Sequence, residues 1–172
     1  SQGRFLGYIG HCFDITERKM AEEMLRSQTR VLERVAAGAA LEETLDMLAR
    51  AIEARLPELR CSFLLADGAR GTLRHGAAPS LPKRYIAAID GIAIGPGAGA
   101  CGTAAYRREA VFVADAATDP LWADFRDIAT EFGIVSCWST PILDARGDVL
   151  GTLALYGDEV ALPAAAVLEV ID

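Results

Sequence analysis

The sequence contains no asparagine, only two histidines and only four cysteines, and these low counts narrow the kinds of site that it can carry. The cysteines, at positions 12, 61, 101 and 137, lie far apart and form no CxxC pair, so they match neither a disulfide framework nor a zinc site. Widely spaced cysteines of this kind fit a reducing compartment, and we expect a cytoplasmic protein. No run of about eighteen apolar residues is present, which predicts no membrane contact from this segment.

The chain is acidic, with a formal net charge of -7 over 172 residues. Binding to phosphate backbones needs a clustered basic face, and the basic pairs here have acidic neighbours, so we expect no nucleic-acid partner. Hydrophobic residues make up 52% and charged residues 24%, which is typical of a folded globular chain. The length allows one sizeable domain and an extension.

Alternating and apolar runs predict strands, and longer periodic runs predict helices. The expected strands are 60–66, 72–77, 92–94, 111–114, 135–143 and 149–156, and the expected helices include an apolar stripe from Leu41 to Leu56 and the segments 82–89, 98–108 and 121–132. The last two strands are apolar at nearly every position, which indicates helices on both faces of the sheet. Gly147 stands in the polar loop between them, where a hairpin needs a positive φ.

Three motifs between positions 95 and 156 are the most informative part of the chain. They are GPGAGACGTAAY at 95–106, DPLW at 119–122 and CWSTPI at 137–142. Their order and wording resemble the GAF domain, and within it the bacterial subgroup that contains GSCGTAAY, DPLW and CWSTPI. The resemblance implies an α+β, three-layer fold: an antiparallel sheet of about six strands, long N- and C-terminal helices on one face, and short helices over a pocket on the other. It also implies a sensory domain and not an enzyme.

The N-terminal part resembles the end of a different sensory domain. Residues 14–19 read DITERK, which is similar to the exit of a PAS domain. We therefore expect a PAS strand remnant at 1–16, a signalling helix at 17–38, a GAF domain at 39–162 and the start of an outgoing helix at 163–172. The order implies an excerpt from a longer PAS–GAF signalling protein, whose output is either a two-component histidine kinase or a GGDEF/EAL domain that makes or degrades cyclic-di-GMP.

The helix expected at 17–38 carries a heptad pattern. Its apolar positions, with one polar layer at Gln28, are Ala21, Leu25, Gln28, Leu32 and Val35. A stripe of this spacing is typical of a short parallel coiled coil, so we expect a homodimer through the N- and C-terminal helices. The alternative is that this stripe packs on its own domain.

The candidate ligand-binding residues are Cys101, Trp122, Trp138, Ser139 and Asp115. Aromatic residues grouped in one half of a domain usually form its core, and here they could also line a pocket for a flat or apolar ligand, with the polar residues contacting it. The ligand itself stays unknown. No cofactor or metal is expected, because the signatures of cyclic-nucleotide and bilin GAF domains are missing and His75 fits an exposed strand position better than a haem ligand.

Two other functions remain open. The segment GACGTA at 99–104 resembles the free methionine-(R)-sulfoxide reductases, which are GAF-fold enzymes with a second cysteine in an acidic loop. Here the later cysteine, Cys137, falls within a strand, and we expect the two thiols not to meet. The other possibility is a dimerisation spacer without a ligand. A phosphate-binding loop at 95–100 is disfavoured, because it lacks the Lys-Ser/Thr ending of a P-loop.

Overall fold

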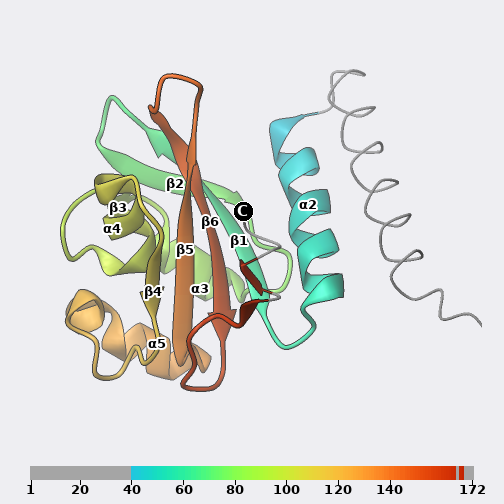
Figure 1. Ribbon diagram of the computed structural model, residues 1–172, viewed down its shortest axis with the longest axis vertical. Coiled ribbons are helices and arrows are strands. Elements are labelled where there is room, and N and C mark those ends of the chain that lie inside the picture. Colours follow the sequence, from blue (N-terminus) through green and yellow to red (C-terminus); the bar gives the residue numbers. More distant parts are fainter. Residues whose placement is uncertain (1–39, 166, 169–172) are drawn as a thin grey trace, which may run out of the picture.

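The fold is built on one six-stranded antiparallel sheet, in a computed structural model that describes residues 40–165 and 167–168. The strand order is β3-β2-β1-β6-β5-β4 (Figure 1). The strands are β1 (Arg60–Asp67), β2 (Thr72–Ala77), β3 (Ile92–Ala93), β4 (Val111–Val113), β5 (Ser136–Leu143) and β6 (Val149–Gly157). The helices are α2 (Leu41–Arg55), α3 (Lys83–Ile89), α4 (Gly99–Arg107), the 3-10 helix η1 (Pro120–Phe125) and α5 (Arg126–Phe132). The α+β class and the sheet predicted from the sequence are confirmed.

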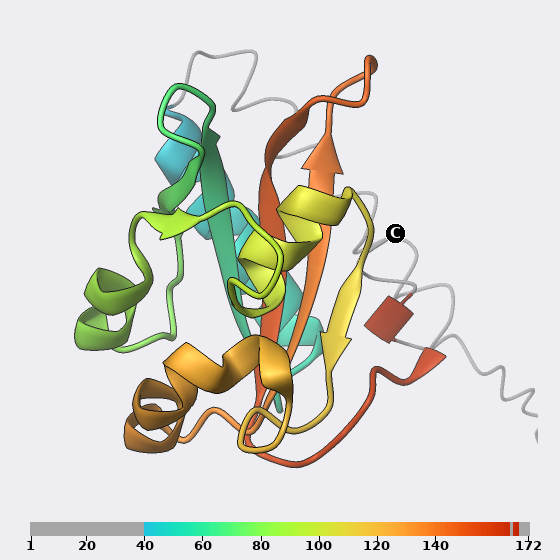
Figure 2. The same cartoon turned by 90° about the vertical axis from the view of Figure 1, so that its left-hand side faces the viewer.

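Helices cover both faces of this sheet. Helix α2 lies on one side, the back face, while α3, α4, η1 and α5 lie on the other, the front face (Figures 1 and 2). The PAS remnant, the heptad stripe and half of the expected C-terminal helix (residues 166 and 169–172) fall outside the described residues.

The two faces carry separate hydrophobic cores because side chains alternate along a strand. On β6, Leu153 and Leu155 belong to the back core with α2, whereas Ala154 and Tyr156 belong to the front core. Both faces of the central strands are therefore buried, which explains why these strands are apolar throughout.

One expected helix is divided into two. The segment predicted as a single helix at 121–132 begins as η1, where the Asp119 carboxylate accepts a hydrogen bond from Leu121 N at 2.8 Å and Pro120 takes the first position. At Phe125 the backbone leaves helical geometry, with φ -117° and ψ 1°, and α5 starts at the next residue. Gly133, in the left-handed conformation, ends α5.

The β5–β6 loop has the geometry that its sequence predicts. Gly147 has a φ of 84°, and the Asp144 carboxylate accepts hydrogen bonds from Arg146 N at 2.8 Å and Asp148 N at 2.9 Å. These backbone donors, with that of Asp148 contributing most, lower the pKa of Asp144. The loop therefore fixes the register of the two strands that carry the floor of the site.

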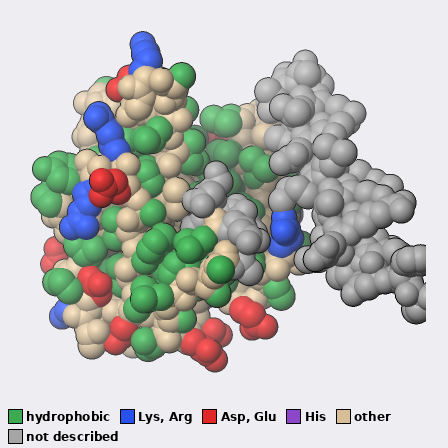
Figure 3. All heavy atoms as spheres, in the orientation of Figure 1, with side chains coloured by type: hydrophobic (Ala, Val, Ile, Leu, Met, Phe, Trp, Pro, Cys, Tyr) green, Lys and Arg blue, Asp and Glu red, His purple; other side chains and the backbone are tan. Residues whose placement is uncertain are grey.

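The surface shows no single basic face in the view of Figure 3. Lys and Arg side chains of the described residues stand at separate places there, and acidic side chains gather toward its lower edge. No described helix is long and apolar enough to cross a membrane.

Candidate functional site

A small internal cavity, called here the front cavity, lies between the front face of the sheet and helices α3, α4 and η1. Its volume is about 20 Å³, which is room for about one water molecule. The lining residues come from six elements: Tyr85, Ile89, Ile92, Gly99, Ala100, Cys101, Trp122, Phe125, Cys137 and Tyr156. No Asp, Glu, Lys, Arg or His is among these ten residues, so the cavity holds no carboxylate or permanent cation to pair with a charged ligand.

Two glycines place α4, and with it Cys101, close to the sheet. Gly99 opens the helix with a φ of 62°, which favours a residue without a Cβ. Gly102 faces β3, where an added Cβ would overlap the Ala93 carbonyl oxygen and lie 2.6 Å from the Ala98 Cβ. The helix is tied to the preceding loop through Gly95 N, which donates to the Gly102 carbonyl at 3.2 Å. This close approach buries Cys101, which is 5% exposed.

Buried polar groups form the floor beneath Cys101. The Cys101 Sγ lies 4.0 Å from the Tyr156 hydroxyl, and that hydroxyl lies 3.1 Å from Ser62 Oγ on β1. Tyr156 is paired in register with Cys137 of β5, which also lines the cavity. The two thiols therefore share one cavity, and the expectation that they do not meet is wrong. The reason is that α4 packs on the front face of β5, and Cys137 of β5 points to that same face.

The surroundings separate the acidities of the two thiols. A hydrogen bond with Cys137 lowers the pKa of Cys101 from 9.0 to about 7, and the hydroxyls of Ser139, Tyr156 and Thr152 act in the same direction, against the opposing effect of burial. Burial raises the pKa of Cys137 well above its usual value. Cys101 is thus the nucleophilic sulfur of the pair, and Cys137 keeps its proton.

Aromatic rings close the cavity on its outer side. Trp122 is 4% exposed and meets Phe125 edge to face, with ring centroids 6.2 Å apart. Tyr85 of α3 meets Tyr156 in the same manner at 5.7 Å. The indole Nε1 of Trp122 is buried and has no hydrogen-bond partner. A buried donor without a partner costs about 1–3 kcal/mol, and a ligand with an acceptor atom would remove that cost.

The other candidate residues lie outside the cavity lining. Trp138 faces the back core, where its Nε1 donates to the Ala161 carbonyl at 3.0 Å, so its expected place in the pocket is wrong. The reason is strand alternation: Cys137 and Trp138 are neighbours on β5 and must point to opposite faces. Ser139 is buried on the front side and donates to the Leu153 carbonyl at 3.3 Å. Asp115 shapes a turn by accepting from Ala117 N at 3.0 Å and the Thr118 hydroxyl at 2.9 Å.

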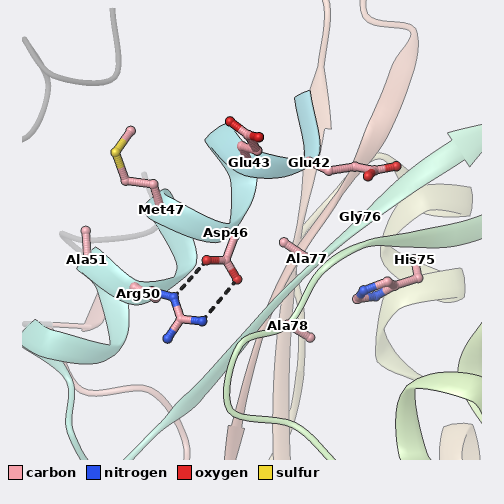
Figure 4. Close-up of a pocket in the computed structure, with 10 residues that line it drawn as sticks. All are labelled: Glu42, Glu43, Asp46, Met47, Arg50, Ala51, His75, Gly76, Ala77 and Ala78. Atoms are coloured by element: carbon pink, nitrogen blue, oxygen red, sulfur yellow. Dashed lines mark hydrogen bonds and ion pairs between the residues drawn. The ribbon is translucent and has the colours of Figure 1, made fainter. Parts of the chain in front are cut away.

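A second hollow is larger and open to solvent. This groove of about 870 Å³ lies between α2 and β2 and is lined by residues 42, 43, 46, 47, 50, 51 and 75–78 (Figure 4). Asp46 and Arg50 form an ion pair in it, with Oδ2 and Nε 2.7 Å apart; the Arg50 side chain is largely exposed and that of Asp46 is partly buried. His75, at its edge, is also exposed. No group of three metal-ligating side chains occurs within residues 40–165 and 167–168.

Comparison with known proteins agrees with this architecture. The sequence-family model of the GAF domain matches residues 40–167. The chain belongs to the GAF domain family. A relative that is 41% identical over 170 residues is the methyl sulfide methyltransferase-associated sensor of Methanosarcina acetivorans. The match covers 99% of this chain and 17% of that protein, so this chain spans less than a fifth of its relative's length.

Solved GAF structures share the fold at lower identity. A domain of a two-component sensor histidine kinase protein from Sinorhizobium meliloti 1021 is 27% identical with a TM-score of 0.62, over 76% of this chain and 82% of that one. The GAF domain of a phosphoenolpyruvate-protein phosphotransferase from Coxiella burnetii is 23% identical with a TM-score of 0.67, over 87% and 86%. The free methionine-R-sulfoxide reductase of Neisseria meningitidis is 21% identical with a TM-score of 0.62, over 83% and 80%.

Proposed function

We propose that this GAF domain senses a small uncharged molecule in the front cavity and reports it, through helices of a homodimer, to an output domain of a cytoplasmic signalling protein. The observation that carries the proposal is the buried Trp122 Nε1, which has no partner and belongs to a residue of a cavity lined by no Asp, Glu, Lys, Arg or His. A carbonyl, ether or similar acceptor on the ligand would satisfy this donor.

The size of the cavity implies that binding moves its walls. Room for about one water molecule is too little for a metabolite, so a ligand must displace Trp122 or Phe125 on η1. A short 3-10 helix held at its start by Asp119 is a suitable moving part, since Trp122 is the one buried residue among its six. The displacement would shift the equilibrium between two packings of the front face, and this change in population is how the domain would report the ligand.

The relatives support a signalling parent. One is named as a sensor and another comes from a sensor histidine kinase protein. The output that this chain regulates is, in our proposal, either a histidine kinase or a GGDEF/EAL domain for cyclic-di-GMP. The same proposal includes three features expected from the sequence: membership of the motif subgroup, a PAS remnant at the N-terminus, and dimer formation through the heptad stripe at positions 21–35.

A ligand screen tests the sensing function. Thermal unfolding of the chain should be measured against a metabolite library that contains both charged and uncharged compounds. We expect hits among uncharged compounds with a hydrogen-bond acceptor, and we expect Trp122→Phe to weaken their effect, because it keeps an aromatic ring but removes the donor. A library without any hit would favour the ligand-free spacer.

The reductase alternative has one observation in its favour, since Cys101 and Cys137 line the same cavity. It lacks a carboxylate for the ammonium group of free methionine sulfoxide, because none is present in the lining. The test is turnover of free methionine sulfoxide with a thiol reductant. A rate equal to that of Cys101→Ser would exclude the enzyme, and a rate well above it would replace the sensor proposal.

A further inference from the structure

The three described cysteines are divided between the two faces of the sheet. Cys101 and Cys137 line the front cavity, one from the first turns of α4 and the other from β5. Cys61 of β1 lies in the back core with α2 and Trp138. The sheet therefore separates Cys61 from the other two, and only the front pair shares a common space.

We propose that Cys101 and Cys137 form an oxidation site, in which a small peroxide that enters the front cavity converts the two thiols into a disulfide between α4 and β5. This reaction is independent of the ligand-sensing proposal, because it needs neither the Trp122 donor nor an output domain. Its substrate class is hydrogen peroxide, whose size is close to that of the water molecule for which the cavity has room.

The chemistry balances within the pair. The Cys101 thiolate attacks one peroxide oxygen, the O–O bond breaks, and a sulfenic acid forms while hydroxide leaves and takes up the proton that Cys101 released. The Cys137 sulfur then attacks the Cys101 sulfur, the S–O bond breaks, and the second water leaves with the Cys137 proton. Two thiols and one hydrogen peroxide thus give one disulfide and two water molecules.

The electrostatics of the cavity suit this order of events. Cys101 has the acidic thiol, with a pKa of about 7, because Cys137 and the nearby hydroxyls stabilise its thiolate. Burial raises the pKa of Cys61 to about 12, which keeps that thiol protonated and unreactive. The chain therefore contains its own control cysteine, on the same sheet and equally buried.

A disulfide at this place would have a structural effect. It would join α4 to the central strand β5 and hold the helix that forms one wall of the cavity. Because α4 also contacts η1 through Gly99 and Phe125, whose ring lies 3.7 Å from the position of an added Gly99 Cβ, the crosslink would restrict the movement of the outer wall. Oxidation would then oppose ligand entry.

The test is peptide mapping of the 172-residue chain after oxidation. The reduced chain is treated with hydrogen peroxide, alkylated in denaturant, digested and analysed by mass spectrometry. Among the three described cysteines we expect one linked peptide pair, Cys101 with Cys137, lighter by two hydrogen atoms than the two reduced peptides, with Cys61 recovered in its alkylated form. Cumene hydroperoxide, which is much larger than the cavity, should give the same pair far more slowly.

Matched variants complete the experiment. Cys61→Ser should oxidise as the wild type does, whereas Cys137→Ser should stop at the sulfenic acid on Cys101, which a dimedone probe detects without requiring a disulfide. The proposal is overturned if folded wild-type protein yields no Cys101–Cys137 peptide, if Cys61 is oxidised first, or if the bulky peroxide reacts as fast as hydrogen peroxide.

Discussion

Trp122 and Trp138 lie on opposite faces of the same sheet, and only one of them has a partner for its indole nitrogen. Trp138 Nε1 donates to the Ala161 carbonyl at 3.0 Å within the back core. Trp122 lines the front cavity, and its Nε1 is buried without a hydrogen-bond partner. On the back face the tryptophan is therefore a core residue whose N–H donor is hydrogen-bonded, and on the front face it lines a cavity and its N–H donor has no partner.

Replacing each tryptophan by phenylalanine should separate these roles. Trp138→Phe removes a hydrogen bond and should lower the free energy of unfolding by about 1–3 kcal/mol. Trp122→Phe removes the same ring atoms but a donor that has no partner, so we expect a smaller loss than for Trp138→Phe. Urea unfolding of both variants at one pH measures the difference. Equal losses would mean that Trp122 is a core residue like Trp138.

Gly102 should be intolerant of any side chain. A Cβ at this position would overlap the Ala93 carbonyl oxygen, so Gly102→Ala must push α4 away from β3 and should cost about 1–3 kcal/mol of stability. Gly68 is the matched control, because its added Cβ would meet nothing within 4 Å and its φ is not positive. Thermal unfolding of the two alanine variants provides the comparison, and an unchanged Gly102→Ala would show that α4 does not approach β3 this closely.

The Cys101 thiol should make stability depend on pH. Its pKa of about 7 lies below the ordinary 9.0, so between these values the unfolded chain binds more protons than the native one, and stability rises with pH. The gain, present above pH 9, is lost as the pH falls through 7. Its full size is about 2–3 kcal/mol, because each pKa unit corresponds to about 1.4 kcal/mol. Urea unfolding at pH 6 and pH 8.5 should show this rise in the wild type and not in Cys101→Ser; parallel curves would contradict the assigned acidity.

The sequence predicted the fold closely because its signals are local. Apolar runs gave the strands, and Asp119-Pro120 gave the start of η1. The site was predicted only in part. Cys101 and Trp122 could be found from motifs, but Trp138 was grouped with them by its nearness in sequence, although strand alternation turns it to the other face. The contact between the rings of Tyr85 and Tyr156 could not be predicted, because it depends on how α3 packs on the sheet.

The heptad stripe leads to a prediction about assembly. Positions 21–35 lie outside the described residues, and pairing through them stays a prediction. If they join two chains in parallel, changing both Leu25 and Leu32 to Glu should give monomers that retain a folded GAF domain, because charges then replace two apolar layers. Light scattering together with circular dichroism checks this. A dimer of unchanged mass would place the interface elsewhere.

The central claim is that a ligand enters the front cavity beside Trp122, and the fluorescence of this one residue tests it most directly. The chain has two tryptophans, so Trp138→Phe leaves Trp122 as the only indole, and Trp122→Phe leaves Trp138. A ligand that raises the melting temperature should shift the emission of Trp122 in a saturable way and leave that of Trp138 unchanged. A ligand that stabilises the protein without changing Trp122, or that changes Trp138 instead, would contradict the account.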